Sequence, residues 1–435
     1  MKRLVFLFVL GLLGLIAVQW QGEKRVFSQG KPVVVLSGEI DSNRTLSNSN
    51  DYVLSGTVFV VAPARLTIQP GTTIYGEGST NGTLVIARGA QIVARGTADA
   101  PIVFTSDQGE GDRNRADWGG LIINGRAPIN VPGGTAFGEG DTGAYGGSQA
   151  NDNSGVLNYV RVEFAGTEFS PDNELNGIAL QGVGRKTEID HVQVHFNQDD
   201  CIEFFGGAAD AKHVLCTGTR DDNLDWTEGW QGRLQFLVAQ QKGDASDQGI
   251  EADNNAENNN LTPRSSPKIY NVTLIGAPKQ GTGSDIGMLL REGTAGTIRN
   301  FVVMGFKEVG LEVDHQATFQ QASTGALSIG NGILFQNGEG NFSNDEDEDP
   351  APPFTTAEWA GDSDQIFQGN PGLVRPYNIS NPDFRPRSGS ALINGSIRVA
   401  TPPNDGFFDV VDFIGALGPA AADDWTKGWT TFAQH

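Results

Sequence analysis

A near-repeat in the middle of the chain constrains the fold more than any other feature. The segment HVQVHFNQDDCIEFFGG begins at His191, and HVLCTGTRDDNLDWTEGW begins at His213, so equivalent residues lie 22 positions apart. The aligned acidic pairs are Asp199 with Asp221, Asp200 with Asp222, and Glu203 with Asp225. Self-similarity at a period of about 20–29 residues indicates stacked supersecondary units, and a β-rich unit without helical periodicity favours a coil of parallel strands.

A third, less regular copy extends the repeat. In this copy Phe236 aligns with Val214, Val238 with Cys216, and Glu251 with Asp225. Alternation of apolar and polar residues predicts which side chains face the interior of the coil. The predicted interior residues are Ile178, Leu180, Ile202, Phe204, Leu224, Trp226 and Ile250 on one wall, and Val192, Val194, Val214, Cys216, Phe236 and Val238 on another. The predicted fold is an all-β, right-handed parallel β-helix with about 22–24 residues per coil.

Charge narrows the possible partners. The 435 residues include 30 lysines and arginines against 52 aspartates and glutamates, a formal net charge of −22. Binding to phosphate backbones needs clustered cations, so nucleic acid is excluded as a partner. Cations and glycans remain compatible with this composition.

The N-terminus predicts export. Lys2 and Arg3 precede an apolar run from Leu4 to Val18, which suits a secretory signal and is shorter than the roughly 20 residues of a membrane span. We expect a signal peptide over residues 1–28, a secreted or cell-surface protein, and no membrane span in the mature form. The β-helix is expected over 29–343, an acidic and proline-rich linker over 344–356, and a C-terminal region over 357–435 that packs on the coil as a cap.

Two cysteines are too few for a disulfide framework. Cys216 falls in an inward column of the repeat, whereas Cys201 falls in a column predicted to point outward or lie at a corner. The expectation is two unpaired thiols rather than a bridge.

A glycine-rich segment from Val131 to Gly155 interrupts the strand pattern. It is predicted to leave the coil as a loop. Long loops on a rigid scaffold often carry binding residues, and a disordered excursion is the alternative.

Several phrases resemble a known family. They are LTIQPGTTIYG, RGAQIVARGTADAPIVFTSD, QDDCIEFFGG, NPDFRPRSGSALINGS and FIGALG. Nearly the whole chain after the signal resembles secreted bacterial right-handed parallel β-helix proteins of the pectin-lyase-like class. The resemblance implies the fold, and it implies no particular activity because this scaffold hosts several.

The phrase QDDCI also resembles the Asp-Asp-Cys phrase of polygalacturonases. The other phrases of those enzymes, Asn-Thr-Asp in the preceding coil, Gly-His-Gly in the following coil and Arg-Ile-Lys further on, are absent here. Only Asp199 and Asp200 are therefore transferable as catalytic candidates, to which the repeat adds Asp221 and Asp222.

Stacked coils place equivalent acidic residues about 4.8 Å apart. We expect Glu203, Asp225 and Glu251 to form an outward row, with Asp199 beside Asp221 at the corner and a further column of aspartates. That column is predicted to hold Asp200, Asp222 and Asp244. Like charges at this spacing repel, so three outcomes are open: the side chains spread into water, a carboxylate pair hydrolyses glycosides, or calcium bridges them. The calcium ligands would be Asp200, Asp222, Glu203, Asp225 and Glu251.

Two aromatic residues adjoin the acidic row. Phe205 and Trp230 are predicted to be exposed beside carboxylates, an arrangement that can hold a sugar ring. Packing under loops is the alternative. The predicted function is binding of a polysaccharide or cell-surface component, of cations, or of both, through Glu203, Asp225, Glu251, Phe205 and Trp230. A polysaccharide hydrolase or lyase is the first alternative, and a structural surface protein is the second.

Overall fold

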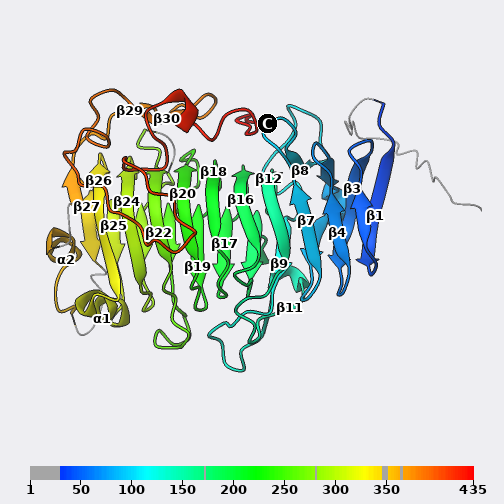
Figure 1. Cartoon of the computed structure of the whole chain (residues 1–435), viewed down its shortest axis with the longest axis horizontal. Helices are drawn as coiled ribbons and strands as arrows, with labels where there is room; N and C mark the ends of the chain where they lie inside the picture. The colour runs from blue at the N-terminus through cyan, green and yellow to red at the C-terminus, as the bar shows by residue number, and fades with distance from the viewer. Residues whose placement is uncertain (1–29, 171–172, 280–281, 345–350, 363–365) are drawn as a thin grey trace, which may run out of the picture.

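The computed structural model describes residues 30–170, 173–279, 282–344, 351–362 and 366–435. These residues form a parallel β-helix in which each coil pairs with the next through parallel strands (Figure 1). The register of the pairings divides the coil into three faces. This architecture confirms the predicted fold class.

One face, here called the acidic face, is built from short strands that stack in register. They are β6 (Thr83–Ile86), β9 (Leu121–Asn124), β15 (Ile178–Gln181), β17 (Ile202–Phe205), β19 (Leu224–Thr227), β21 (Ile250–Ala252), β23 (Met288–Leu290), β25 (Val309–Val313) and β27 (Gly340–Asn344). Alternate residues of each strand point into the core, so the intervening ones form columns on the outside.

The other two faces share longer strands, each bent in the middle. They are β12 (Gly155–Glu163), β16 (Glu188–His195), β18 (Ala211–Thr217), β20 (Arg233–Gln240), β22 (Lys268–Ile275), β24 (Gly296–Met304) and β26 (Leu327–Phe335). One residue at each bend has positive φ, and these residues form the bend column: Tyr159, His191, His213, Phe236, Asn271, Asn300 and Asn331. Asparagine tolerates this left-handed conformation better than most residues, which suits it to the last three coils.

The strands of the N-terminal coils vary in length from 3 to 10 residues. They are β1 (Val33–Ile40), β2 (Arg44–Leu46), β3 (Asp51–Val60), β4 (Arg65–Ile68), β5 (Thr73–Gly76), β7 (Gln91–Arg95) and β8 (Ile102–Ser106), with the 3₁₀ turn η1 (Gly78–Thr80). The opposite end of the coil carries two short helices, α1 (Gln316–Thr324) and α2 (Thr356–Asp362) (Figure 1).

The core is the interior of the coil. All seven residues predicted on the first inner wall are buried there, as are Val192, Val194, Val214 and Cys216. The prediction that Phe236 and Val238 point into the interior is wrong. Strand β20 is shifted by one residue from the predicted alignment, so Val214 pairs with Leu237. Val238 consequently faces outward under the C-terminal segment, and Phe236 occupies the bend column.

The prediction of two unpaired thiols is also wrong. Cys201 and Cys216 form a disulfide with a Cα–Cα distance of 5.8 Å, and both residues are fully buried. The repeat had placed them in different columns, which says nothing about contacts across the interior. Cys201 precedes β17 on one face and Cys216 lies in β18 on another, and the coil brings them together inside.

The glycine-rich segment leaves the coil as an ordered loop. It holds the hairpin β10 (Ala136–Phe137) and β11 (Ala144–Tyr145) and the turn η2 (Glu139–Asp141). Turn η2 packs beside a second small hairpin, β13 (Glu168–Ser170) with β14 (Asn173–Glu174). Both excursions lie at the acidic face.

The C-terminal segment covers the bent strands. After β28 (Ile366–Gln368) it forms β29 (Leu373–Arg375), β30 (Asp383–Pro386) and the turn η3 (Ala421–Asp423), and Figure 1 shows it in orange and red running back along the coil. It buries an outward-facing apolar cluster that includes Leu215, Val238, Ile275, Val302 and Ile333.

The predicted signal peptide and residues 345–350 of the predicted acidic linker lie outside the described residues. Within the described residues, no helix is long and apolar enough to cross a membrane.

Candidate functional site

The acidic residues of β17, β19 and β21 stack in register. Glu203 pairs with Asp225, and Asp225 pairs with Glu251, one per coil. Their degree of burial differs along the row, because Glu203 is 8% exposed whereas Asp225 and Glu251 are partly exposed. The expectation that the whole row faces solvent is therefore wrong at Glu203, where loops cover it.

Buried aspartates form the corner that leads into these strands. Asp200 Oδ1 accepts a hydrogen bond from the backbone N–H of Asp222 at 2.9 Å. One coil further, Asp222 Oδ1 accepts from the backbone N–H of Gln248 at 2.6 Å. These bonds tie successive coils together and position both carboxylates, which are 6% and 4% exposed.

The third member predicted for this column, Asp244, lies elsewhere. It pairs with Arg115 at 3.0 Å and with Lys242 at 3.4 Å. An insertion between β20 and β21 shifts the chain, so Asp247 instead approaches Asp221 and Asp222. The repeat could not predict this because the insertion breaks its period.

The carboxylates converge in four overlapping groups of three. In each group, one oxygen from every residue lies within 4.8 Å of the others. The groups are Asp199, Asp200 and Asp221; Asp200, Glu203 and Asp225; Asp221, Asp222 and Asp247; and Asp222, Asp225 and Glu251. Each group shares one residue with each of two other groups, so these eight residues, which we call the acidic cluster, are continuous across three coils.

Burial and mutual repulsion make ionisation of this cluster costly. Burial, together with neighbouring carboxylates, raises the pKa of Asp199 to about 8 and that of Glu251 to about 8. The pKa values of Asp200, Glu203, Asp222 and Asp225 are also raised well above their usual range by the same two causes. At neutral pH the cluster must therefore hold protons or gain positive charge.

Protein cations supply only part of that charge. Arg291 forms ion pairs with Glu251 and, at 2.9 Å, with Asp253 at one end of the cluster. Arg220 lowers the pKa of Asp221 from the exposed side, although burial raises it more.

Asp225, at the centre of the cluster, has an unsatisfied oxygen. Its Oδ1 is buried and has no hydrogen-bond partner among the described residues. Asn176 contacts the neighbouring carboxylate, donating from Nδ2 to Glu203 Oε2 at 2.6 Å. A buried carboxylate oxygen without a donor is costly unless a proton or a cation satisfies it.

The exposed side of the cluster opens into a cleft of about 650 Å³. Six carboxylates and one arginine contribute to its lining: Glu168, Glu174, Asp199, Asp221, Asp247, Asp285 and Arg220. A hydrogen bond between the side chains of Asp247 and Asp285 contributes to a raised pKa of about 6 for Asp247, after burial and other charges.

Loops cover the other side of the acidic cluster. Tyr145 of the β10–β11 hairpin donates its hydroxyl to Glu228 Oε2 at 2.9 Å and lies edge-on to Phe205 at 6.1 Å. Phe205 is thus partly buried, packed in a small apolar cluster that also contains Ala179 and Leu175. It does not present the open ring face expected for stacking on a sugar.

The prediction that Trp230 is exposed beside carboxylates is wrong. It is fully buried, stacks on Phe204 with ring centroids 4.0 Å apart, and donates its indole N–H to the Ala209 carbonyl. Its large apolar surface fills the coil interior, which the sequence position at a turn did not reveal.

Several site residues were missed from the sequence. They are Glu168, Glu174, Asp247, Asp285 and Arg291. They come from hairpins and inter-strand loops that lie outside the repeat, so periodicity carried no signal for them.

The geometry suits a hard cation. Calcium takes six to eight oxygen ligands from carboxylates, carbonyls and water, and a chain of half-buried carboxylates offers such ligands. The metal-ligand candidates Asp200, Asp222, Glu203, Asp225 and Glu251 all lie in the cluster, and Asp199, Asp221 and Asp247 extend it into the cleft.

A family model described as a pectate-lyase-like β-helix domain matches residues 38–366. No curated protein and no solved structure matched the chain. The match spans most of the chain and agrees with the coil, so the protein belongs to the pectate-lyase-like β-helix domain family.

Proposed function

We propose that the acidic cluster binds divalent cations, with calcium as the physiological candidate. The observation that carries this proposal is the buried Oδ1 of Asp225, which lacks a hydrogen-bond partner among the described residues. Asp225 belongs to two of the four convergent carboxylate groups. A cation there would satisfy that oxygen and offset the repulsion between Asp222, Asp225 and Glu251.

The open cleft extends this proposal to glycans. A calcium ion held from one side by protein oxygens keeps coordination positions for hydroxyl or carboxylate oxygens of a ligand. Because Phe205 and Trp230 are packed away, recognition would rest on the cation and polar groups rather than on aromatic stacking.

We also propose an extracytoplasmic location, which would suit calcium binding. The apolar N-terminal run favours export, and the Cys201–Cys216 disulfide is typical of oxidising compartments. Calcium is abundant in many such environments, and extracellular modules work with dissociation constants of roughly 10⁻⁴–10⁻³ M.

Calorimetry on the mature chain tests the proposal. We expect saturable heat on titration with calcium, and we expect Asp225→Asn to weaken binding at least about tenfold, equivalent to about 1.4 kcal/mol. Asparagine keeps the shape of the side chain and removes its charge. Glu39→Gln is the matched control, since Glu39 is exposed on β1, outside the acidic cluster. Absence of calcium heat at millimolar concentrations would rule the proposal out.

Glycoside hydrolysis is the second candidate. It is favoured by the pairing of Asp199, whose pKa is raised to about 8, with Asp221 in an open cleft. A protonated carboxyl beside an ionised one is the set that a glycosidase needs. The close approach of the oxygens, within 4.8 Å, suits a shared cation better than the roughly 5–5.5 Å or 6.5–9.5 Å between glycosidase carboxyls. Release of reducing ends from polysaccharides, abolished by Asp199→Asn, would establish hydrolysis instead.

A further inference from the structure

A second hollow lies at a different corner of the coil. The residue that directly follows each bent strand forms a corner column: Phe164, Phe196, Gly218, Gln241, Gly276, Gly305 and Gln336. The strands before these residues pair in register, so their positions are equivalent. Gly276 and Gly305 are neighbours in this column. A Cβ on Gly276 would lie 2.6 Å from the Gly305 carbonyl oxygen and 2.6 Å from Ser284 Oγ, so the backbone is closely packed at this corner.

The C-terminal segment covers this part of the corner column. A Cβ on Gly305 would lie 2.7 Å from the Tyr377 hydroxyl oxygen and 2.9 Å from Cε1 of its ring, so glycine is required for Tyr377 to sit there. Gly305 also has φ +78°, which favours glycine independently. Beside Tyr377, between this segment and the coil, lies a cavity of about 200 Å³.

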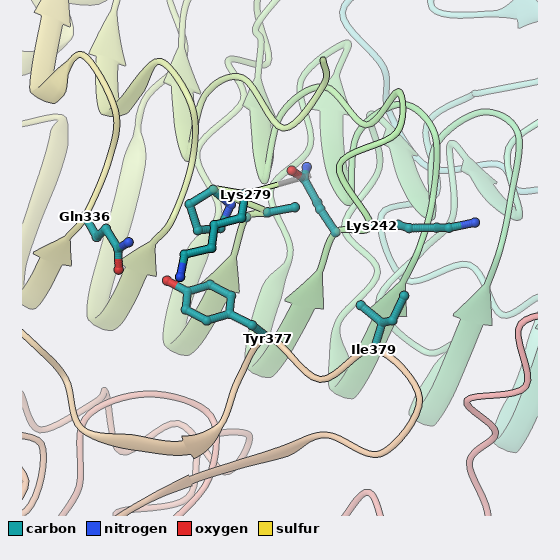
Figure 2. A pocket seen from close by; sticks show the side chains of 9 residues that line it. Lys242, Lys279, Gln336, Tyr377 and Ile379 are labelled. Atoms are coloured by element: carbon teal, nitrogen blue, oxygen red, sulfur yellow. The ribbon is translucent and has the colours of Figure 1, made fainter. Parts of the chain in front are cut away.

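The lining of the cavity is amphipathic. Figure 2 shows Tyr377 and Ile379 on the C-terminal segment, with Lys279 and Gln336 on the coils opposite. Ala277 and Pro278 add apolar surface, and Lys242 completes the rim. Burial raises the pKa of Tyr377 to about 12, so its hydroxyl remains a hydrogen-bond donor at neutral pH.

Electrostatics distinguish this cavity from the acidic cleft. Lys242 is held in place by Asp244 at 3.4 Å and by the Phe196 ring at 5.0 Å, whereas Lys279 is exposed. Because Arg115 and Lys242 share the carboxylate of Asp244, the positive charge available to a ligand in this cavity comes from Lys279. No carboxylate is among the residues that line the cavity, although the chain carries a net charge of −22.

We propose that this cavity, between Gly276, Lys279 and Tyr377, binds a small organic anion: a carboxylate on a compact apolar body. Lys279 would pair with the carboxylate, and the Tyr377 ring and Ile379 would contact the apolar part. The cavity is smaller than the roughly 300 Å³ at which sites for drug-sized ligands begin, so the ligand is of about the size of benzoate.

Calorimetry with three small carboxylates, benzoate, hexanoate and acetate, tests this site in buffer without divalent cations. We expect benzoate or hexanoate to give saturable binding. We also expect benzamide and benzylamine, which match benzoate in size but are neutral or cationic, to bind at least about tenfold more weakly. Acetate, which lacks the apolar body, should bind more weakly than hexanoate.

Two variants localise the binding. Lys279→Gln should weaken binding of the carboxylate about tenfold, and Tyr377→Ala should weaken it by removing one wall. Lys268→Gln, a matched change at an exposed lysine on β22 outside the cavity, should leave affinity unchanged. The site is ruled out if none of the carboxylates binds, if benzamide binds as well as benzoate, or if Lys279→Gln and Lys268→Gln behave alike.

Discussion

At the scale of single residues, the Cys201–Cys216 disulfide restrains the backbone that carries part of the acidic cluster. Cys201 directly follows Asp199 and Asp200 and precedes β17, which carries Glu203. Its bond to Cys216 closes a loop with a sequence separation of 15 residues that contains this strand. The bridge thus restrains the corner at which the buried aspartates enter the acidic face.

Replacing both cysteines with alanine should lower the free energy of unfolding by about 3 kcal/mol, the value expected for a loop of this length. Urea unfolding of the oxidised protein and of the double variant measures the difference. Thiol reductant during unfolding should bring the wild type to the variant's midpoint and leave the variant unchanged. Equal midpoints for the two oxidised proteins would contradict a stabilising role.

At the scale of elements, the bend column anchors the C-terminal segment. The rings of Tyr159, His191, His213 and Phe236 stack in that order, with centroids between 4.1 and 4.9 Å apart. Asp190 Oδ1 lies 2.9 Å from His191 Nδ1 and 2.7 Å from His213 Nδ1. Both imidazoles thus face the same carboxylate while their rings pack between Tyr159 and Phe236.

The asparagines further along the column bind backbone instead of stacking. Asn300 donates to the Ala400 carbonyl at 2.9 Å and accepts from its N–H at 2.8 Å, while Asn331 donates to the Arg398 carbonyl. The column therefore changes from aromatic contacts to amide hydrogen bonds, and both hold the same C-terminal segment on the coil.

Trp429 is the aromatic anchor of that segment. It is fully buried, with its ring 5.6 Å from Tyr159 and 5.9 Å from His191. Trp429→Ala should weaken the docking of the segment on the coil by about 3–5 kcal/mol. The segment should then be cleaved faster in limited proteolysis. Val410→Ala is the control, because Val410 is 72% exposed. Unchanged cleavage of the Trp429 variant would mean that the rest of the segment docks independently.

At the scale of the whole molecule, charge couples stability to cations and pH. The carboxyls of the acidic cluster have folded pKa values above their unfolded values near 4, so their protonated forms are favoured by folding. Their contribution to stability is fully present below about pH 4 and is lost as pH rises through the folded pKa values, near 8 for Asp199 and Glu251.

In chelator, the melting temperature should therefore fall between pH 6.5 and 8.5. Calcium binds the ionised carboxylates, so it should stabilise the protein more at pH 8.5 than at pH 6.5. At pH 8.5 the stabilisation should be about 2.7 kcal/mol when calcium is at a hundredfold excess over Kd. Scanning calorimetry at both pH values, with and without calcium, measures this. Asp225→Asn should reduce the calcium effect, and a calcium effect that is larger at pH 6.5 would contradict the linkage.

The sequence alone determined the coil and most of its inner columns. A fixed repeat places equivalent residues one above another, so Ile202, Leu224 and Ile250 could be assigned to one wall without coordinates. The same logic predicted the row of Glu203, Asp225 and Glu251. Periodicity is a property of neighbouring coils, and these features depend only on neighbouring coils.

Only the tertiary structure decided contacts across the coil and between loops. The Cys201–Cys216 bond crosses the interior, and Trp230 turns inward from a corner. Asp247 reaches the acidic cluster because an insertion displaces Asp244. These contacts join residues with no fixed spacing, because insertions at the corners change the length of each coil while leaving the strand register intact. The burial that raises the pKa values of the cluster is set by these loops, and the repeat carried no information about it.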